Sequence, residues 1–279
     1  MIDPPEETTA DDRTTMRPWR GETLIMGIVN VTPDSFSDGG QWLDPVAAID
    51  HGFALVDDGA DMLDVGAEST RPGFEPVTPA QQISRLKPVV ERLAEAGVPL
   101  SVDTRSAEVA SMALACGATI VNDVSGGQYD PAMLPLVAAA GVDFVCQSWR
   151  RPDVTSLRGV GSGPFDELLW RRDACLDAGI AVDHIILDPG VGFGSGAEDD
   201  WAVLADIAAL TDTGHRVLVG ASRKRFLATP GDSPADRDPA AAAVTAWCAE
   251  RGVWAVRVHS VGIHRQAIRV IRRLAGERA

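Results

Sequence analysis

Lysine is nearly absent from this chain, and negative charge is in excess. Lys87 and Lys224 are the only lysines in 279 residues, and the formal net charge is −15 at pH 7. This charge argues against general attraction to nucleic acid or to an anionic membrane surface, because both require a positive field. An anionic substrate would therefore have to be bound by a local cationic cluster or by a metal ion. The stretch "GASRKRF" at 220–226, which contains Lys224, is such a cluster.

Long apolar runs, paired cysteine motifs and a secretory signal are also missing. No stretch approaches the roughly 18 apolar residues of a membrane-spanning helix. Residues 1–20 are acidic and rich in Thr and Pro, so we expect a flexible tail there. The four cysteines are far apart and mostly lie in apolar runs, which predicts reduced, buried thiols in a cytoplasmic protein. They are Cys116, Cys146, Cys175 and Cys248.

Short runs with β-strand character alternate with stretches of helical apolar spacing. Eight such runs predict strands, at 23–30, 61–69, 98–104, 118–125, 142–148, 184–190, 215–222 and 254–260. Helical spacing appears at 44–60, 78–97, 106–118, 130–141 and 238–252. Eight strand–helix units in about 250 residues predict a (β/α)8 TIM barrel, an α/β fold, in a single domain over 21–279. A doubly wound open sheet is the alternative, but no G-x-G-x-x-G motif follows the first strand.

Polar residues gather where these predicted strands end. TIM barrels place their active sites at the carboxyl ends of the strands, because eight loops converge there. Two long polar loops, 30–40 and 66–77, have the Gly, Pro, Ser and Asp content of segments that close over a ligand. We therefore expect a site built from the strand-end residues Asn30, Asp64, Glu68, Asp103, Asn122, Asp123, Gln147, Ser148, Asp188, Ser222, Lys224, Arg257 and His259.

Seven motifs at these positions resemble those of one enzyme family. In order they are "MGIVNVTPDSFSDGG", "DVGAESTRPG", "SVDT", "VNDVSGG", "LDPGVGFG", "GASRKRF" and "VRVH". Over about residues 21–275 the chain resembles the dihydropteroate synthases, folate-pathway enzymes of the pterin-binding barrel family. The resemblance implies a transferase that joins 4-aminobenzoate to (7,8-dihydropterin-6-yl)methyl diphosphate and releases pyrophosphate. Because the leaving group is so stable, we expect an SN1-like step, with no side-chain nucleophile.

The resemblance implies a set of pterin-binding residues. A pterin edge presents N–H donors that carboxylates and an amide can accept from, while a lysine can donate to the ring carbonyl and N5. The implied set is Asp103, Asn122, Asp188, Phe193, Gly220 and Lys224. Among these and the pyrophosphate residues, the catalytic ones would be Lys224, Asp103, Arg257 and His259.

The resemblance also implies sites for the second substrate, the diphosphate and a cofactor. The 4-aminobenzoate residues would be Phe36, Thr70, Arg71, Pro72 and Ser222. The pyrophosphate residues would be Asn30, Ser69, Thr70, Arg257 and His259. Asn30 would also bind Mg²⁺, an ion that takes few protein ligands and bridges phosphate oxygens. A homodimer is implied as well, and the apolar stretch 240–256 suits either a core or an interface.

The chain departs from the family pattern at several loop positions. Gln147 stands where Met is common, Ser148 where His is usual, Ser195 replaces Lys, Asp199 and Asp200 replace a His-Asn pair, and Ser260 replaces Asp. We expect these changes to make the rim of the site more acidic. They leave open a weakly active or inactive paralogue that binds a pterin or uses another amine. A methyltetrahydrofolate–corrinoid methyltransferase is disfavoured, because it would not need the "STRPG" loop or the Arg-x-His motif.

Overall fold

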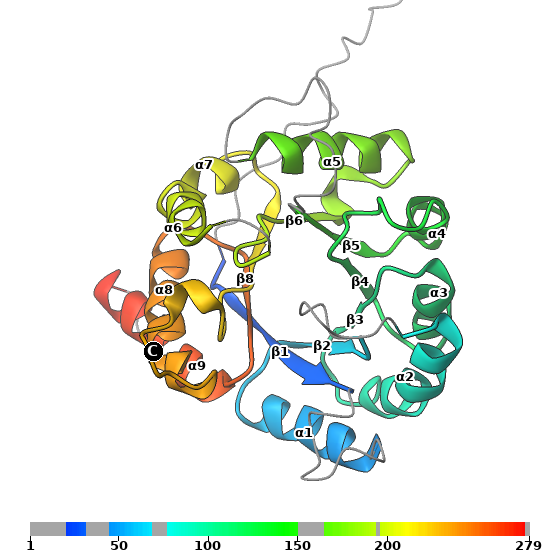
Figure 1. Ribbon diagram of the computed structural model, residues 1–279, viewed down its shortest axis with the longest axis horizontal. Coiled ribbons are helices and arrows are strands. Elements are labelled where there is room, and N and C mark those ends of the chain that lie inside the picture. Colours follow the sequence, from blue (N-terminus) through cyan, green and yellow to red (C-terminus); the bar gives the residue numbers. More distant parts are fainter. Residues whose placement is uncertain (1–20, 32–44, 69–76, 150–164, 194–195, 277–279) are drawn as a thin grey trace, which may run out of the picture.

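Eight parallel strands close into a barrel. The computed structural model describes residues 21–31, 45–68, 77–149, 165–193 and 196–276. The strands are β1 (Leu24–Asn30), β2 (Met62–Gly66), β3 (Leu100–Asp103), β4 (Ile120–Asp123), β5 (Asp143–Gln147), β6 (Ile185–Asp188), β7 (Arg216–Val219) and β8 (Ala255–Val258). Each pairs with the next in parallel, and β8 pairs with β1 (Figure 1). This closure confirms the TIM barrel, and all eight predicted strands are present. An open sheet is excluded.

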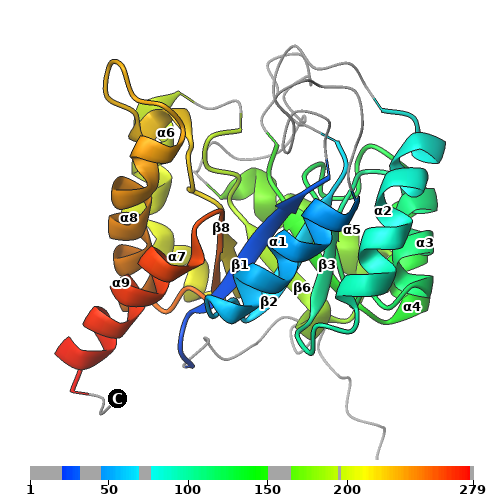
Figure 2. The ribbon, with the colours of Figure 1, turned by 90° about the horizontal axis from the view of Figure 1, so that it is seen from below.

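Helices surround the strands on the outside of the barrel (Figures 1 and 2). They are α1 (Pro45–Asp57), α2 (Pro79–Leu93), α3 (Ala107–Ala115), α4 (Met133–Ala140), α5 (Asp166–Asp177), α6 (Ala197–Ala205), α7 (Ile207–Thr211), α8 (Asp238–Glu250) and α9 (Val261–Leu274). Short 3₁₀ turns cover Val182–His184, Arg225–Leu227 and Ala235–Arg237. The five predicted helical stretches correspond to α1 to α4 and α8. None of the helices described is long and apolar enough to cross a membrane.

Local sequence explains where some of these helices begin and end. Thr78 caps α2, where its hydroxyl accepts from the Gln81 amide and the Gln81 side chain accepts from the Thr78 amide. This reciprocal pair satisfies two backbone donors that the first turn leaves unpaired. At the C-terminal end of α4, Gly141 adopts the left-handed conformation with φ 63°, which glycine allows without steric cost.

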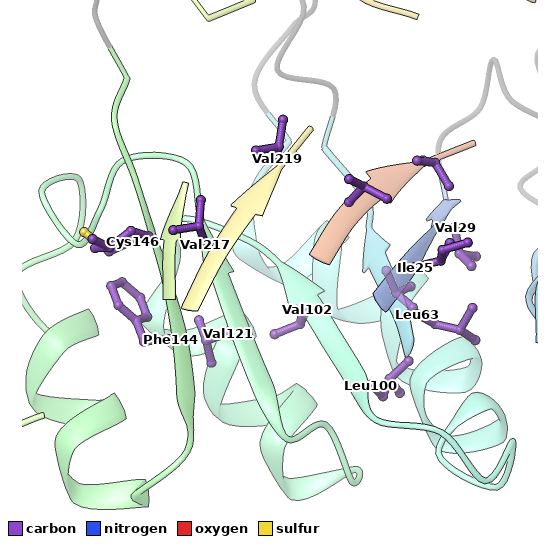
Figure 3. Close-up of a cluster of buried hydrophobic side chains, with 14 of the residues drawn as sticks. Ile25, Val29, Leu63, Leu100, Val102, Val121, Phe144, Cys146, Val217 and Val219 are labelled. Carbon is purple, nitrogen blue, oxygen red and sulfur yellow. The ribbon is translucent and has the colours of Figure 1, made fainter. Parts of the chain in front are cut away.

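Strand residues alternate between the interior of the barrel and the layer under the helices. The outer layer is one large apolar cluster, part of which Figure 3 shows, including Ile25, Leu63, Val121, Phe144 and Val217. A separate cluster fills the interior, with Met26, Met62, Ile120, Val145, Ile186, Leu218 and Ala255. Because side chains alternate with a period of two, the residue two places after each of these also faces inward. On most strands that residue is one of the predicted site residues.

All four cysteines are free thiols, as the sequence predicts. Cys146, Cys175 and Cys248 are buried, and Cys116 is partly buried. Burial raises the pKa of the Cys248 thiol to about 12, so this side chain stays protonated at neutral pH. The predicted flexible tail at 1–20 lies outside the described residues.

Two buried histidines make the stability of the barrel depend on pH. His215 precedes β7 and is 1 % exposed, and His264 in α9 is equally buried, with its Nδ1 2.7 Å from the Thr245 hydroxyl. Burial lowers the pKa of each ring to about 4. Both rings are therefore neutral in the folded protein at neutral pH. An unfolded chain would take up their protons near pH 6.5.

His215→Gln should reduce the loss of stability in acid. The folded pKa lies below the unfolded value, so this stability is present above about pH 6.5 and is lost as the pH falls toward 4. Between pH 7.5 and pH 5 the free energy of unfolding of the wild type should fall by about 2 kcal/mol more than that of the variant. Urea unfolding at both pH values measures this difference.

His51→Gln is the matched control, because His51 is only partly buried in α1. Its comparison with His215→Gln separates the effect of the buried ring from the effect of replacing a histidine by glutamine. Carboxylates that titrate in the same range are common to all three proteins and cancel in the comparison. Equal slopes for the wild type and His215→Gln would show that His215 carries no such linkage.

Candidate active site

The carboxyl ends of the strands bring the predicted residues together at one end of the barrel. Ten of the residues to which the resemblance assigns a ligand are described: Asn30, Asp103, Asn122, Asp188, Phe193, Gly220, Ser222, Lys224, Arg257 and His259. Every one is the last residue of a strand or lies on or just beyond its carboxyl end. The predicted residues Phe36, Ser69, Thr70, Arg71 and Pro72 lie outside the described residues, as does the departure at Ser195.

Arg257 on β8 connects two carboxylates across the mouth of the barrel. Its Nε donates to Asp64 Oδ2 at 2.6 Å, and a terminal nitrogen donates to Asp103 Oδ2 at 2.9 Å. Asn122 on β4 donates to the same Asp64 oxygen at 3.0 Å. Four strands, β2, β3, β4 and β8, are therefore joined by one charged network. The charge-assisted bonds to Arg257 compensate part of the cost of burying the two carboxylates.

Asp64 is a member of this network to which the sequence assigned no role. It is fully buried, and its Oδ1 has no hydrogen-bond partner among the described residues. Asn122 Oδ1 and Gln147 Nε2 are also buried without such a partner. The sequence placed Asp64 among the strand-end site residues, and its parity on β2, two residues after the inward-facing Met62, explains why it faces the site.

Burial raises the pKa of two carboxyl groups in the site toward neutrality. For Asp103 it reaches about 7, since burial and the neighbouring carboxylates Asp64, Asp123 and Glu68 outweigh the attraction of Arg257. For Asp188 it reaches about 6, since burial outweighs the hydrogen bond from the Gly190 amide at 2.7 Å. Both groups can therefore change protonation near neutral pH.

Lys224 lies over an aromatic ring at the edge of the same site. Its Nζ is 3.4 Å from the centroid of the Phe193 ring, a cation–π contact. A Cβ on Gly192, which has φ +77°, would come within 2.7 Å of Lys224 Cδ, so glycine makes room for the lysine. Burial and the repulsion of Arg257 lower the pKa of Lys224 to about 7, against the attraction of Asp188 and Asp103.

Ser222 and His259 join the ends of β7 and β8. The Ser222 hydroxyl is 2.9 Å from His259 Nδ1 and accepts from the His259 backbone amide at 3.2 Å. The resemblance implied a place for Ser222 on the 4-aminobenzoate side and for His259 at the pyrophosphate. Their direct contact means that these two predicted subsites adjoin.

Three of the departures from the family pattern have a structural role. Asp200 is 3 % exposed and accepts from the Gly192 amide at 2.8 Å, so it lies inside the protein and is bonded to the loop that carries Gly192. The expectation that it adds to an acidic rim is wrong, because this hydrogen bond turns the side chain inward. Asp199 is at the exposed start of α6, where it accepts from the Gly196 amide at 3.2 Å. Ser260 donates to Asp238 Oδ2 at 2.6 Å.

The last two departures are on β5 and just after it. Gln147 and Ser148 are both 4 % exposed. The Ser148 hydroxyl has no hydrogen-bond partner within the described ranges. Its backbone amide donates to the Asp188 carbonyl at 3.0 Å, which extends the pairing of β5 with β6. These side chains add no charge to the site.

Comparison with known proteins places the whole barrel in one family. The family model described as pterin binding enzyme matches residues 26–259. The dihydropteroate synthase of Mycobacterium leprae is 45% identical over 260 residues, which cover 88% of this chain and 92% of that protein. The Bacillus subtilis enzyme of the same name is 39% identical, over 87% of this chain and 85% of that protein.

Solved structures agree in fold as well as in sequence. A Xanthomonas albilineans dihydropteroate synthase with 4-aminobenzoic acid has a TM-score of 0.84 and 38% identity, and covers 91% of this chain and 94% of that chain. The same organism's enzyme in complex with 7,8-dihydropteroate has a TM-score of 0.82 and 36% identity, over 92% and 95% of the two chains. By sequence and by fold, this protein belongs to the pterin binding enzyme family.

Proposed function

We propose that this protein is a dihydropteroate synthase, a transferase that condenses 4-aminobenzoate with (7,8-dihydropterin-6-yl)methyl diphosphate to give 7,8-dihydropteroate and pyrophosphate. One observation carries the proposal: Asp103, Asn122, Asp188 and Lys224 lie at one end of a closed barrel, beside Arg257. Similar enzymes are known with 4-aminobenzoic acid and with 7,8-dihydropteroate. The function belongs to folate biosynthesis.

The site offers the groups that a pterin ring requires. A carboxylate accepts hydrogen bonds from the N–H donors of the amino-pyrimidine edge, and the Asn122 side-chain amide adds a further hydrogen bond to that edge. Lys224 donates to the ring carbonyl or N5. Lys224 lies over the Phe193 ring, and Gly220 adds no side chain just after β7. Asp103 and Asp188 are already removed from water in the folded protein. Ligand binding therefore does not add the cost of their desolvation.

The reaction proceeds by departure of the diphosphate before attack. The bond between the pterin methylene carbon and the diphosphate oxygen breaks, and its electron pair leaves with pyrophosphate. The amine nitrogen of 4-aminobenzoate then attacks the methylene cation and loses a proton. Arg257 and His259 would stabilise the charge on the leaving group, because donors aimed at developing negative charge lower the barrier. Ser222, bonded to His259, would orient the aminobenzoate.

Asn30 at the end of β1 fits a magnesium ion. Its amide oxygen is a hard ligand at the carboxyl edge, next to Gly66 on β2. No group of three or more His, Cys, Asp or Glu that could hold a metal occurs within the described ranges. Mg²⁺ suits such a site, because it keeps several waters and takes phosphate oxygens as ligands. When bound, the ion would neutralise charge on the diphosphate.

We also propose a cytoplasmic homodimer. Trp201 on α6 and Trp247 on α8 are 44% and 40% exposed, and the Trp247 indole donates to the Leu204 carbonyl at 2.7 Å, which joins these two helices. Exposed aromatic side chains are enriched at protein interfaces. The partners of the site itself are small molecules.

Pyrophosphate release that depends on 4-aminobenzoate tests the proposed reaction. Purified protein with the pterin diphosphate and Mg²⁺ should release pyrophosphate and form dihydropteroate only when 4-aminobenzoate is present. Lys224→Ala and Asp103→Ala should each lower kcat/KM by roughly 100-fold or more, because each removes a group that binds the reacting ring. Lys87→Ala, which changes the exposed lysine of α2, should match the wild type. Binding of the pterin diphosphate without product would instead identify a non-catalytic pterin-binding protein.

The rate should fall on both sides of neutral pH. Protonation of Asp103 and Asp188, with pKa values of about 7 and about 6, removes acceptors and lowers kcat/KM in acid. Loss of the Lys224 proton, with a pKa of about 7, lowers it in base. Lys224→Arg should abolish the alkaline limb, since arginine stays charged. Lys87→Arg should keep both limbs. An alkaline limb that persists in Lys224→Arg would exclude Lys224 as its origin.

Asp64→Asn should move the acid limb of kcat/KM to lower pH. The Asp64 carboxylate raises the pKa of Asp103, so its neutralisation should let Asp103 ionise more easily and leave Arg257 to pair with it alone. Asp61→Asn is the control, because Asp61 precedes the same strand and contacts Arg265 at the opposite end of the barrel. A pure loss of folded protein would lower the rate without moving the limb, and would argue against a role for Asp64 in the site.

A further inference from the structure

The turn between Ser222 and Lys224 has an unusual backbone conformation. Arg223 has φ 61°, and it is the one non-glycine residue with positive φ in the part of the chain that the structure describes. This left-handed region is disfavoured for residues with a side chain, because Cβ crowds the following carbonyl. Such a conformation persists only where surrounding contacts hold it. The contacts of Arg223 should therefore matter for the residues on either side.

Arg223 is held by three residues that lie 14 to 37 positions further along the chain. Its Nε and a terminal nitrogen donate to the two carboxylate oxygens of Asp238 at 3.0 Å each, in a fork. The same terminal nitrogen donates to Ser260 Oγ at 3.1 Å, and Ser260 donates to Asp238 Oδ2 at 2.6 Å. Arg237 donates to the backbone carbonyl of Arg223 at 2.9 Å. We name Arg223, Asp238 and Ser260 the Arg223 clamp.

The clamp joins the β7 loop to two other elements. Asp238 is the first residue of α8, and Ser260 lies between β8 and α9. Bidentate arginine–carboxylate pairs fix geometry as well as contribute energy. Burial would raise the pKa of Asp238, but the hydrogen bonds from Arg223 and Ser260 outweigh it and lower that pKa. The Asp238 carboxylate therefore stays charged at neutral pH and keeps its hold on the guanidinium.

Both neighbours of Arg223 reach into the site while Arg223 reaches away from it. Ser222 contacts His259, and Lys224 lies over Phe193. The left-handed turn at Arg223 is the point where the chain changes direction between these two contacts. Relaxation of this turn toward an ordinary conformation would move at least one of the two side chains.

We propose that Asp238 and Ser260 are positioning residues, which hold Arg223 in its left-handed turn and thereby fix Ser222 and Lys224 in the active site. Neither residue needs to touch a substrate. The effect on rate rests on the proposed function, whereas the effect on the position of Lys224 does not. A displacement of about 1 Å at a reacting group can cost on the order of a hundredfold in rate.

A pair of variants at position 223 separates the backbone from the side chain. Arg223→Ala and Arg223→Gly both remove the guanidinium, but only glycine adopts positive φ without penalty. Arg223→Ala should lower kcat/KM by roughly tenfold or more, and Arg223→Gly should retain several-fold more activity than the alanine variant. If the alanine variant matches the wild type, or if glycine is no better than alanine, the left-handed turn does not set the position of its neighbours.

Asp238→Asn tests the charge that holds the clamp. The amide keeps the size of the side chain but loses the charge and one acceptor, so kcat/KM should fall by roughly tenfold. Asp236→Asn is the matched control two residues away, because Asp236 is exposed and hydrogen bonds to Ser233. The thermal midpoint of each variant should stay within a few degrees of the wild type. A rate that falls only in proportion to the folded fraction would overturn the positioning role.

Ser260→Asp tests whether the clamp tolerates a second carboxylate. The new carboxylate would lie against that of Asp238, at the present 2.6 Å contact, and the two would repel. This variant should be as impaired as Asp238→Asn. The double variant with Asp238→Ser and Ser260→Asp returns one carboxylate and one hydroxyl to the cluster, and should recover several-fold over Ser260→Asp. An active Ser260→Asp variant would contradict the proposal.

The scarcity of lysine allows a test that needs no substrate. An amine-reactive reagent labels only deprotonated amines, so peptide mass spectrometry across a pH series reads the pKa of Lys224, with exposed Lys87 as an internal control. In the wild type the midpoint for Lys224 should be near pH 7. In Arg223→Ala and Asp238→Asn it should rise, because Lys224 would move toward water and away from Arg257.

The two readouts distinguish failure of the clamp from failure of the proposed function. If the wild type makes no dihydropteroate but the Lys224 midpoint still rises in the clamp variants, the reaction is wrong and the clamp is supported. If the reaction proceeds but neither kcat/KM nor the midpoint changes in the variants, the clamp is wrong. Unchanged labelling of exposed Lys87 shows that the reagent acts equally on each protein, and the thermal midpoints show that the folded state is retained.

Discussion

The pairing of Arg257 with Asp64 and Asp103 is the interaction on which the site depends. Asp64 is fully buried at the mouth of the barrel, where an unpaired carboxylate would be costly. One guanidinium bonded to both carboxylates removes part of that cost and joins strands that are distant in sequence. Asn122 on β4 adds a fourth strand to the network. The charged groups can therefore lie directly above the apolar interior of the barrel.

This network also explains why several groups titrate near neutral pH. Burial raises the pKa of Asp103, and the excess of negative charge left by one cation shared between two carboxylates raises it further. Burial lowers the pKa of Lys224, and repulsion by the same cation lowers it further. Acids and a base with pKa values of about 6 to 7 then lie in one site. The protonation of these groups changes when a ligand with its own hydrogen-bond donors and negative charge binds in the site.

Lys224, which can gain or lose its proton near neutral pH, is held in place by contacts from neighbouring loops. Gly192 provides the space, Asp200 fixes the loop that carries it, and Phe193 supports the ammonium group. Replacing a family residue by Asp200 or Ser260 therefore changes how the loops are held more than what the site presents to a ligand. Contacts away from the ligand can vary in this way while the inward-facing residues keep their chemistry.

The sequence by itself determined the fold and most members of the site. Eight apolar runs separated by helical spacing are sufficient for the barrel, and strand-end motifs such as "SVDT" and "GASRKRF" identify Asp103 and Lys224, because in a barrel every strand end meets at one face. Only the tertiary structure decided which of these residues touch. Asp64 and Arg257 are 193 positions apart, and the Arg223 clamp unites three segments. Such contacts depend on barrel closure, register and side-chain direction, which arise from packing of the whole chain and leave no local pattern.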